Sequence, residues 1–143
     1  MDMDLETRTE LLASLNELLE AERAGARVTL RTAGEIDDPE FKQLVAGIHR
    51  DEVRWCGVLM GAVQSMSATP TTRTGAFYDK AMAIPDLRER MVFLNRGQDW
   101  VVRKLRVLLP RIGDERLGAE LAEMLASHET NIAHVNARLG TPT

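Results

Sequence analysis

Six polar residues fall at or near the apolar faces of predicted helices in this sequence, and their types are those that bind metal ions or move protons. Glutamate and histidine side chains hold iron, manganese and zinc in helical bundles, and a glutamate with a perturbed pKa can serve as a general base. A carboxylate on a core-facing position is costly unless it is paired, protonated or bound to something. The six residues are Glu22, His49, Glu52, Gln98, His128 and Asn131.

The first of these residues lies in the stretch LNELLEAERAGA, which begins at Leu15. Leucines at spacings of three and four mark one face of a helix turned toward a core. Continued at the same spacing, this face reaches Glu22 and then the small residues Gly25 and Ala26. A neighbouring helix can therefore approach closely just after the buried glutamate.

Four long helical segments position the six residues. In the second segment His49 precedes Glu52 by one turn, and in the fourth Asn131 follows His128 by one turn. The interrupting residue of each segment lies roughly 13 or 14 residues from the start of its helix, or ~20 Å along the axis. We therefore expect one polar layer at the waist of a bundle. The periodicity predicts these helices at about residues 9–33, 38–66, 85–109 and 115–139.

The lengths of the connections predict the topology. The first and second helices are joined tightly, as are the third and fourth, so each pair is expected to form an antiparallel hairpin. The middle connection has about 18 residues, which could extend to roughly 60 Å, whereas a helix of about 26 residues is ~39 Å long. Residues 67–84 can therefore run the length of the bundle, with room for a short helical turn around Phe77 to Met82. One domain is expected over residues 1–143.

Composition restricts the class of protein. Hydrophobic residues make up 44% and aromatic residues 4% of the 143 residues, a balance that favours aliphatic helix packing over a sheet protein. The net charge of −4 argues against nucleic acid as the main partner. No apolar run approaches the ~18–20 residues that span a bilayer, so no membrane partner is expected. The single cysteine, Cys56, favours a reducing compartment, and we expect a cytoplasmic protein.

The first helix resembles that of bacterioferritin and related proteins, and the chain from about Thr9 to Leu139 resembles the ferritin-like superfamily, above all its uncharacterised families. The resemblance implies an all-α, ferritin-like four-helix bundle of two antiparallel hairpins joined by a long crossover. It also implies a homo-oligomer, with a homodimer as the simplest form. Glu22 falls where the first metal-binding glutamate of these families sits, and Glu52 matches the glutamate of the second helix.

The remaining positions depart from the pattern of the di-iron members. Trp55 stands where the second helix would carry a histidine, and Gln98 replaces the glutamate of the third helix. His128 replaces the glutamate of the fourth helix, and Asn131 replaces its histidine. Four glutamates would balance two divalent ions, but two glutamates leave about two charges uncompensated, at a cost on the order of several kcal/mol. We therefore expect at most one metal ion.

Three hypotheses follow for the waist. The first is a degenerate site that holds one iron, manganese or zinc ion through Glu22, Glu52, His49 and His128, with Gln98 and Asn131 as outer or substituted ligand positions, in a redox or metal-handling protein. The second is a metal-free structural or interaction bundle, in which the same residues form a buried hydrogen-bond layer. The third is an enzyme that uses Glu22 or Glu52 as a general base, which requires an open pocket.

A row of basic residues marks a second face of the first helix. Arg23, Arg27 and Arg31 recur at a spacing of four, which places them side by side on the helix surface. We expect this ridge to be solvated or to contact a partner.

Overall fold

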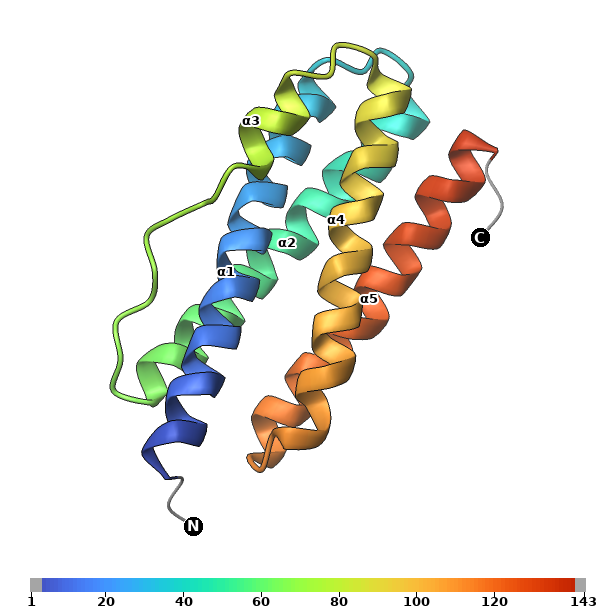
Figure 1. The fold of residues 1–143 in the computed structure, drawn as a ribbon. Helices are drawn as coiled ribbons and strands as arrows, with labels where there is room; N and C mark the ends of the chain where they lie inside the picture. Colours follow the sequence, from blue (N-terminus) through green and yellow to red (C-terminus); the bar gives the residue numbers. More distant parts are fainter. Residues whose placement is uncertain (1–3, 141–143) are drawn as a thin grey trace.

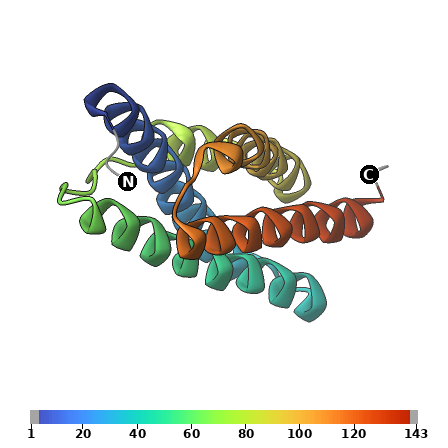
Figure 2. The same ribbon diagram turned by 90° about the horizontal axis from the view of Figure 1, so that it is seen from below.

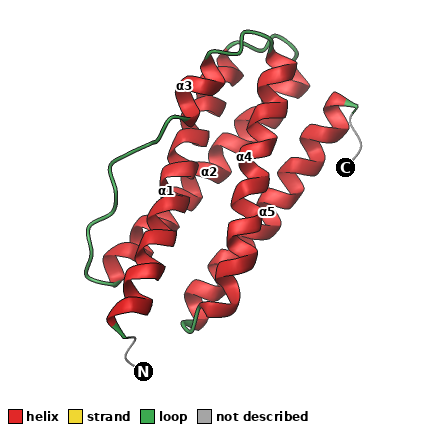
Figure 3. Ribbon diagram, in the orientation of Figure 1, coloured by secondary structure: helices red, strands yellow, loops and turns green. Residues whose placement is uncertain are grey.

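The computed structural model describes residues 4–140 as four long helices in two hairpins (Figure 1). The first hairpin consists of α1 (Leu5–Gly34) and α2 (Pro39–Ser65), and the second of α4 (Leu87–Leu108) and α5 (Glu115–Leu139). A one-turn 3-10 helix, η1 (Leu109–Arg111), precedes the turn into α5. Figure 3 shows helices joined by loops, and no strand occurs within residues 4–140.

Aspartate side chains cap the starts of the four long helices. Asp4, Asp38, Asp86 and Asp114 each accept a hydrogen bond from the backbone N–H three residues later, which satisfies a donor that the helix itself leaves unpaired. The cap at Asp4 begins α1 at Leu5, ahead of the expected start near residue 9. Gly140, with a φ of 73°, ends α5 in the left-handed conformation that glycine adopts without steric cost.

The crossover between the hairpins runs along the outside of α1 and includes the short helix α3 (Phe77–Met82) (Figure 1). Arg23 donates from Nη1 to the carbonyl oxygens of Thr71 and Arg73, at 2.9 Å each. The guanidinium of Arg27 lies 4.0 Å from the ring centroid of Tyr78, and Arg31 donates to the hydroxyl of Tyr78. The basic ridge of α1 therefore binds the crossover of its own chain.

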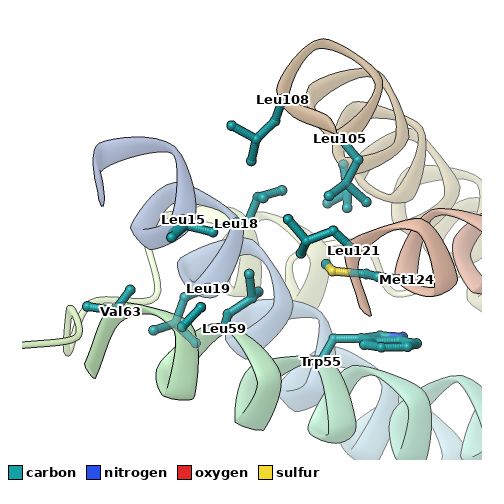
Figure 4. Packing of buried hydrophobic residues seen from close by; sticks show 12 residues of the cluster. Leu15, Leu18, Leu19, Trp55, Leu59, Val63, Leu105, Leu108, Leu121 and Met124 are labelled. Atoms are coloured by element: carbon teal, nitrogen blue, oxygen red, sulfur yellow. The ribbon is translucent and has the colours of Figure 1, made fainter. Parts of the chain in front are cut away.

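The buried apolar side chains form two clusters along the bundle axis. One cluster joins Leu15, Leu18 and Leu19 of α1 to residues of α2, α4 and α5 (Figure 4). The other surrounds Val45 and Ile48 near the α1–α2 turn. The view along the bundle in Figure 2 shows α1 and α2 beside α4 and α5. The residues between the two clusters in sequence are the polar ones of the expected waist. None of the helices in the described part of the chain has a stretch long and apolar enough to cross a membrane.

Candidate functional site

The centre of the waist is a pair formed by Glu22 of α1 and His128 of α5, which are 2% and 1% exposed. Nε2 of His128 lies 2.9 Å from Oε1 and 3.1 Å from Oε2 of Glu22. Nδ1 of His128 lies 2.9 Å from the carbonyl oxygen of Met124, and because a carbonyl only accepts, Nδ1 carries a proton. When Nε2 also carries a proton, the ring donates to the carboxylate of Glu22.

Glu52 of α2 lies against the backbone of α1, at Gly25. A Cβ atom on Gly25 would lie 2.0 Å from Oε2 of Glu52, so only glycine leaves room for this carboxyl group. Glu52 is 2% exposed, and its Oε2 has no hydrogen-bond partner within the described structure. Gly25 was expected to let a neighbouring helix approach closely, and in the structure it makes room for the carboxyl group of Glu52 on α2.

Gln98 of α4 is oriented by a relay of amides. Asn95 donates from Nδ2 to the carbonyl oxygen of Ile132 at 3.2 Å and to Oδ1 of Asn136 at 3.1 Å. This fixes Oδ1 of Asn95 as the acceptor for Nε2 of Gln98, at 3.0 Å. Oε1 of Gln98 is then left as a buried acceptor without a partner in the described structure.

Oε2 of Glu52 and Oε1 of Gln98 therefore lack donors within residues 4–140, and Oε1 of Glu22 has no hydrogen bond of its own there although it lies 2.9 Å from Nε2 of His128. The Nε2 proton of His128 points to one oxygen of Glu22, and the hydrogen-bond geometry favours Oε2. Most buried polar groups in folded proteins are hydrogen-bonded, so a concentration of unpaired acceptors indicates a missing donor or cation.

His49 and Asn131 lie close to the waist but point to other partners. Nδ1 of His49, which is half-buried, lies 2.7 Å from the carbonyl oxygen of Ala26, to which it donates. Asn131 donates from Nδ2 to Oδ2 of Asp51 at 3.1 Å. Both side chains tie neighbouring helices together.

Burial and charge shift two pKa values at the waist in the same direction. Burial, followed by the carboxylates of Glu22 and Asp51, raises the pKa of Glu52 well above its ordinary 4.5. Burial lowers the pKa of His128, but the charge and hydrogen bond of Glu22 and the carbonyl of Met124 outweigh it and raise that pKa above 6.5. The waist therefore holds protons more tightly than free side chains do.

A pocket of about 420 Å³ leads from the surface between α1 and α4 to the waist. Glu22, Glu52 and Gln98 line it together with mostly apolar side chains. Trp100, which is 39% exposed, lies in its wall, whereas Trp55 is fully buried in the core. Glu22 and Glu52 thus line a pocket that opens to solvent, although each residue is only 2% exposed.

Comparison with known proteins places this architecture in a family. The model of a domain of unknown function, DUF6306, matches residues 9–137. The chain belongs to the DUF6306 family. No match was found among curated proteins.

The DUF6306 chain also resembles a solved structure. A crystal structure of ferritin-like, diiron-carboxylate proteins from Bacillus anthracis strain Ames matches with a TM-score of 0.84 and 17% sequence identity, over 96% of this chain and 99% of that chain. The chain therefore has a ferritin-like four-helix-bundle fold, and the fold class expected from the sequence is confirmed.

The polar side chains at the waist of the DUF6306 chain do not form a complete cluster of metal ligands. Within residues 4–140, no three His, Cys, Asp or Glu side chains are arranged to hold a metal ion. The unpartnered oxygens come instead from two glutamates and one glutamine. Carboxylate and amide oxygens suit hard divalent cations, so these atoms fit one such ion, with Gln98 supplying a neutral ligand.

Sequence reasoning missed several residues of this site. Asn95 precedes Gln98 by three residues and so shares its helix face, a spacing that could have indicated the amide pair. Phe77 also lines the pocket, and helical periodicity does not place it there because its position depends on how the crossover docks. Arg96 and Arg103 line the pocket as well, and their spacing of seven residues on α4 puts them on one helix face.

Proposed function

We propose that this ferritin-like protein binds a single divalent metal ion at the base of its pocket. Glu22 and Glu52 would supply the charged ligands and Oε1 of Gln98 a neutral one, while His128 stays hydrogen-bonded to Glu22. The observation that supports the proposal is the set of buried oxygens on Glu22, Glu52 and Gln98 that receive no hydrogen bond within the described residues, all on side chains that line one pocket. A cation is the simplest species that satisfies them together.

The number of charges favours one ion over two. Glu22 and Glu52 together neutralise one divalent cation, whereas a second cation would leave about two positive charges in a buried site, at a cost of roughly several kcal/mol. His128 adds no negative charge. The structural neighbour is described as a diiron-carboxylate protein, and we infer that the present chain binds one metal ion rather than two.

The neighbouring polar residues would support this site from outside it. His128 would orient the Glu22 ligand through Nε2 and is itself held by the hydrogen bond that its Nδ1 donates to Met124. His49 donates to Ala26, and we assign it to holding α2 against α1 rather than to the ion. Asn131 holds Asp51 in the same way. A bound iron or manganese ion would supply redox chemistry, and the role would be metal handling or electron transfer.

Metal content and titration test the proposal. Elemental analysis of protein purified without chelator, followed by calorimetric titration with Mn²⁺, Fe²⁺ and Zn²⁺, should give one ion per chain. Glu52→Gln keeps the shape of the side chain and should abolish binding. Glu123→Gln is the matched control, because Glu123 forms an exposed pair with Arg54. Absence of binding by all three ions to the wild-type protein would contradict the proposal.

A metal-free hydrogen-bond layer is the second candidate, and the pair of Glu22 and His128 supports it. In this pair Nε2 of His128 lies 2.9 Å from Oε1 of Glu22, a contact that would fix the register of α1 against α5. Under this alternative Glu22→Gln should fold and remain as stable as the wild-type protein, because it removes a buried charge and keeps an acceptor. Under the metal proposal the same variant should lose the ion.

A further inference from the structure

The pocket has an apolar wall and a polar base. Its wall includes Phe93, Leu94 and Val101, and also Phe77 from the crossover. The rings of Phe77 and Phe93 stack with centroids 4.9 Å apart. Its base is formed by Glu22, Glu52 and Gln98, which are buried to within 3% exposure. A molecule that fills this space must therefore be apolar over most of its surface and polar at one end.

We propose that this pocket binds a small apolar molecule carrying one hydroxyl group, whose O–H donates to one of the two unpartnered oxygens, that of Glu52 or that of Gln98. This inference uses the residues of the proposed metal site but does not depend on a metal ion. In the metal-free protein, the O–H group of an alcohol or phenol would donate a hydrogen bond to an acceptor oxygen at the base of the pocket.

The size of the pocket sets the size of the molecule. A volume of about 420 Å³ is roughly three times that of the ~150 Å³ cavity that accommodates benzene, and it lies in the usual range for small-molecule sites. One aromatic ring with a short alkyl chain, or two fused rings, would fill it. The aromatic wall residues Phe77, Phe93 and Trp100 favour such a ring through stacked or edge-on contacts.

The chemistry of the base selects the head group. The unpaired atoms at the waist are acceptors, so a head group must donate, and a carboxylate head would meet Glu22 and Glu52 with like charge. An ammonium head would donate, but it would lose its hydration on entering a base whose side chains are almost fully buried. A neutral hydroxyl donates to one of the acceptors without either penalty.

The hydroxyl requirement can be tested with matched probes on protein treated with chelator. Calorimetry should show 4-propylphenol binding about tenfold more tightly than propylbenzene, since the hydroxyl gains hydrogen bonds to buried acceptors that the hydrocarbon leaves unpaired. 4-Propylbenzoate and 4-propylbenzylamine should both bind more weakly than the phenol. Equal binding of phenol and hydrocarbon, or tighter binding of the acid or the amine, would overturn the assignment.

Two variants locate the binding event in the pocket. Ala21 lines the pocket, and Ala21→Leu should reduce the affinity for 4-propylphenol about tenfold or more by occupying its space. Ala133→Leu is the matched control, because Ala133 lines a separate, smaller hollow between α4 and α5. This variant should bind 4-propylphenol with the affinity of the wild-type protein. Unchanged affinity in Ala21→Leu would overturn the proposal.

Gln98→Leu separates the polar from the apolar contribution. The variant should have a lower affinity for 4-propylphenol and an unchanged affinity for propylbenzene. Thermal unfolding would check that each variant folds. If Gln98→Leu fails to fold, the four-probe series on the wild-type protein still decides the question. Because every measurement is made without metal, failure of the metal proposal would leave these results unchanged, and failure here would leave the metal titration unchanged.

Discussion

Two buried charged clusters in this bundle differ in how completely they are paired. Arg90 of α4 is 2% exposed, and it donates to the carbonyl oxygen of Ile84, to the hydroxyl of Thr32 and to the carboxylate of Glu35. At the waist, by contrast, Glu52 is equally buried and its Oε2 has no partner in the described residues. A pocket reaches the waist, and Arg90 does not line it.

The difference separates a buried charge that is fully paired from buried acceptors that are only partly paired. Arg90 joins α1, α4 and the loop before α4 at one end of the bundle, through its bonds to Thr32, Glu35 and Ile84. At the waist, Gly25 and the amide relay hold Glu52 and Gln98 in place, yet Oε2 of Glu52 and Oε1 of Gln98 receive no hydrogen bond within the described residues. A cluster that is buried, oriented and unsatisfied is suited to an external donor or cation.

Loss of Arg90 should give the largest effect on stability. Arg90→Met should lower the free energy of unfolding by about 3 kcal/mol, because Thr32 and Ile84 lose a buried donor. Urea denaturation measures this change. Arg106→Met is the control, since Arg106 forms an exposed pair with Glu129, and it should change stability by about 0.5 kcal/mol or less. Similar effects in both variants would remove the distinction drawn for Arg90.

A methyl group on Gly25 should disturb the waist directly. Gly25→Ala places a Cβ atom on the carboxyl of Glu52, and we expect a loss of about 2 kcal/mol from overpacking. Gly57→Ala is the control, because a Cβ atom there meets no atom within 4 Å, and it should stabilise α2 by up to about 1 kcal/mol.

A double variant attributes the effect of Gly25 to Glu52. Glu52→Ala removes the group that the new methyl would meet, so Gly25→Ala should cost less in the Glu52→Ala background than alone. Strictly additive effects would show that the close approach of Gly25 to Glu52 does not limit the packing.

The charge of the waist should make stability depend on pH. The pKa of Glu52 is raised above 4.5 and that of His128 above 6.5, so the folded state binds these protons more tightly than the unfolded state. The free energy of unfolding should therefore fall as pH rises from about 5 through the folded-state pKa values. Urea denaturation of metal-free protein between pH 5 and pH 9 would measure this slope.

Neutralising Glu52 should reduce that slope. In Glu52→Gln the contribution of Glu52 disappears, leaving that of His128, and the variant should be more stable than the wild type at pH 8 by about 1 kcal/mol. Glu123→Gln should retain the wild-type slope. A wild-type stability that rises across this range would contradict the assignment.

The reactivity of the Cys56 thiol should be sensitive to the charge of the waist, and this is the smallest of the expected effects. Burial, together with the carboxylates of Glu22 and Glu52, raises the pKa of Cys56 to about 12, so the thiol should react slowly with iodoacetamide at pH 8. Glu52→Gln removes one of these charges and should speed the reaction, whereas Glu123→Gln should not. Equal rates in the wild type and Glu52→Gln would show that Cys56 does not sense this carboxylate.

Much of the waist could be predicted because helical periodicity assigns each residue to a face. Glu22, Glu52, Gln98 and His128 each interrupt an apolar stripe, and short turns with one long connection specify the hairpins that bring the stripes together. Periodicity does not give side-chain conformations. His49 lies one turn from Glu52, yet its ring turns to the carbonyl of Ala26.

The pocket could not be predicted for a related reason. It depends on where a 21-residue stretch outside the long helices, from Met66 to Asp86, settles on the bundle, and such a segment has no sustained hydrophobic period. The basic ridge that includes Arg23 and Arg27 was expected to meet solvent or a partner, and it instead holds this segment through carbonyl and aromatic contacts. These contacts join residues about 50 positions apart.

The placement of α3 has a consequence for how this family could diversify. Phe77 presses on α4 at Gly97, where a Cβ atom would lie 2.8 Å from its ring, and it forms part of the pocket wall. The shape of the chamber is thus partly encoded in a connecting segment outside the four long helices, although Ala81 of the same segment is buried in the cluster around Val45 and Ile48. Substitution of Phe77 would reshape the chamber wall while the four long helices keep their pairing, so that relatives could differ in the form of this space without rebuilding the scaffold.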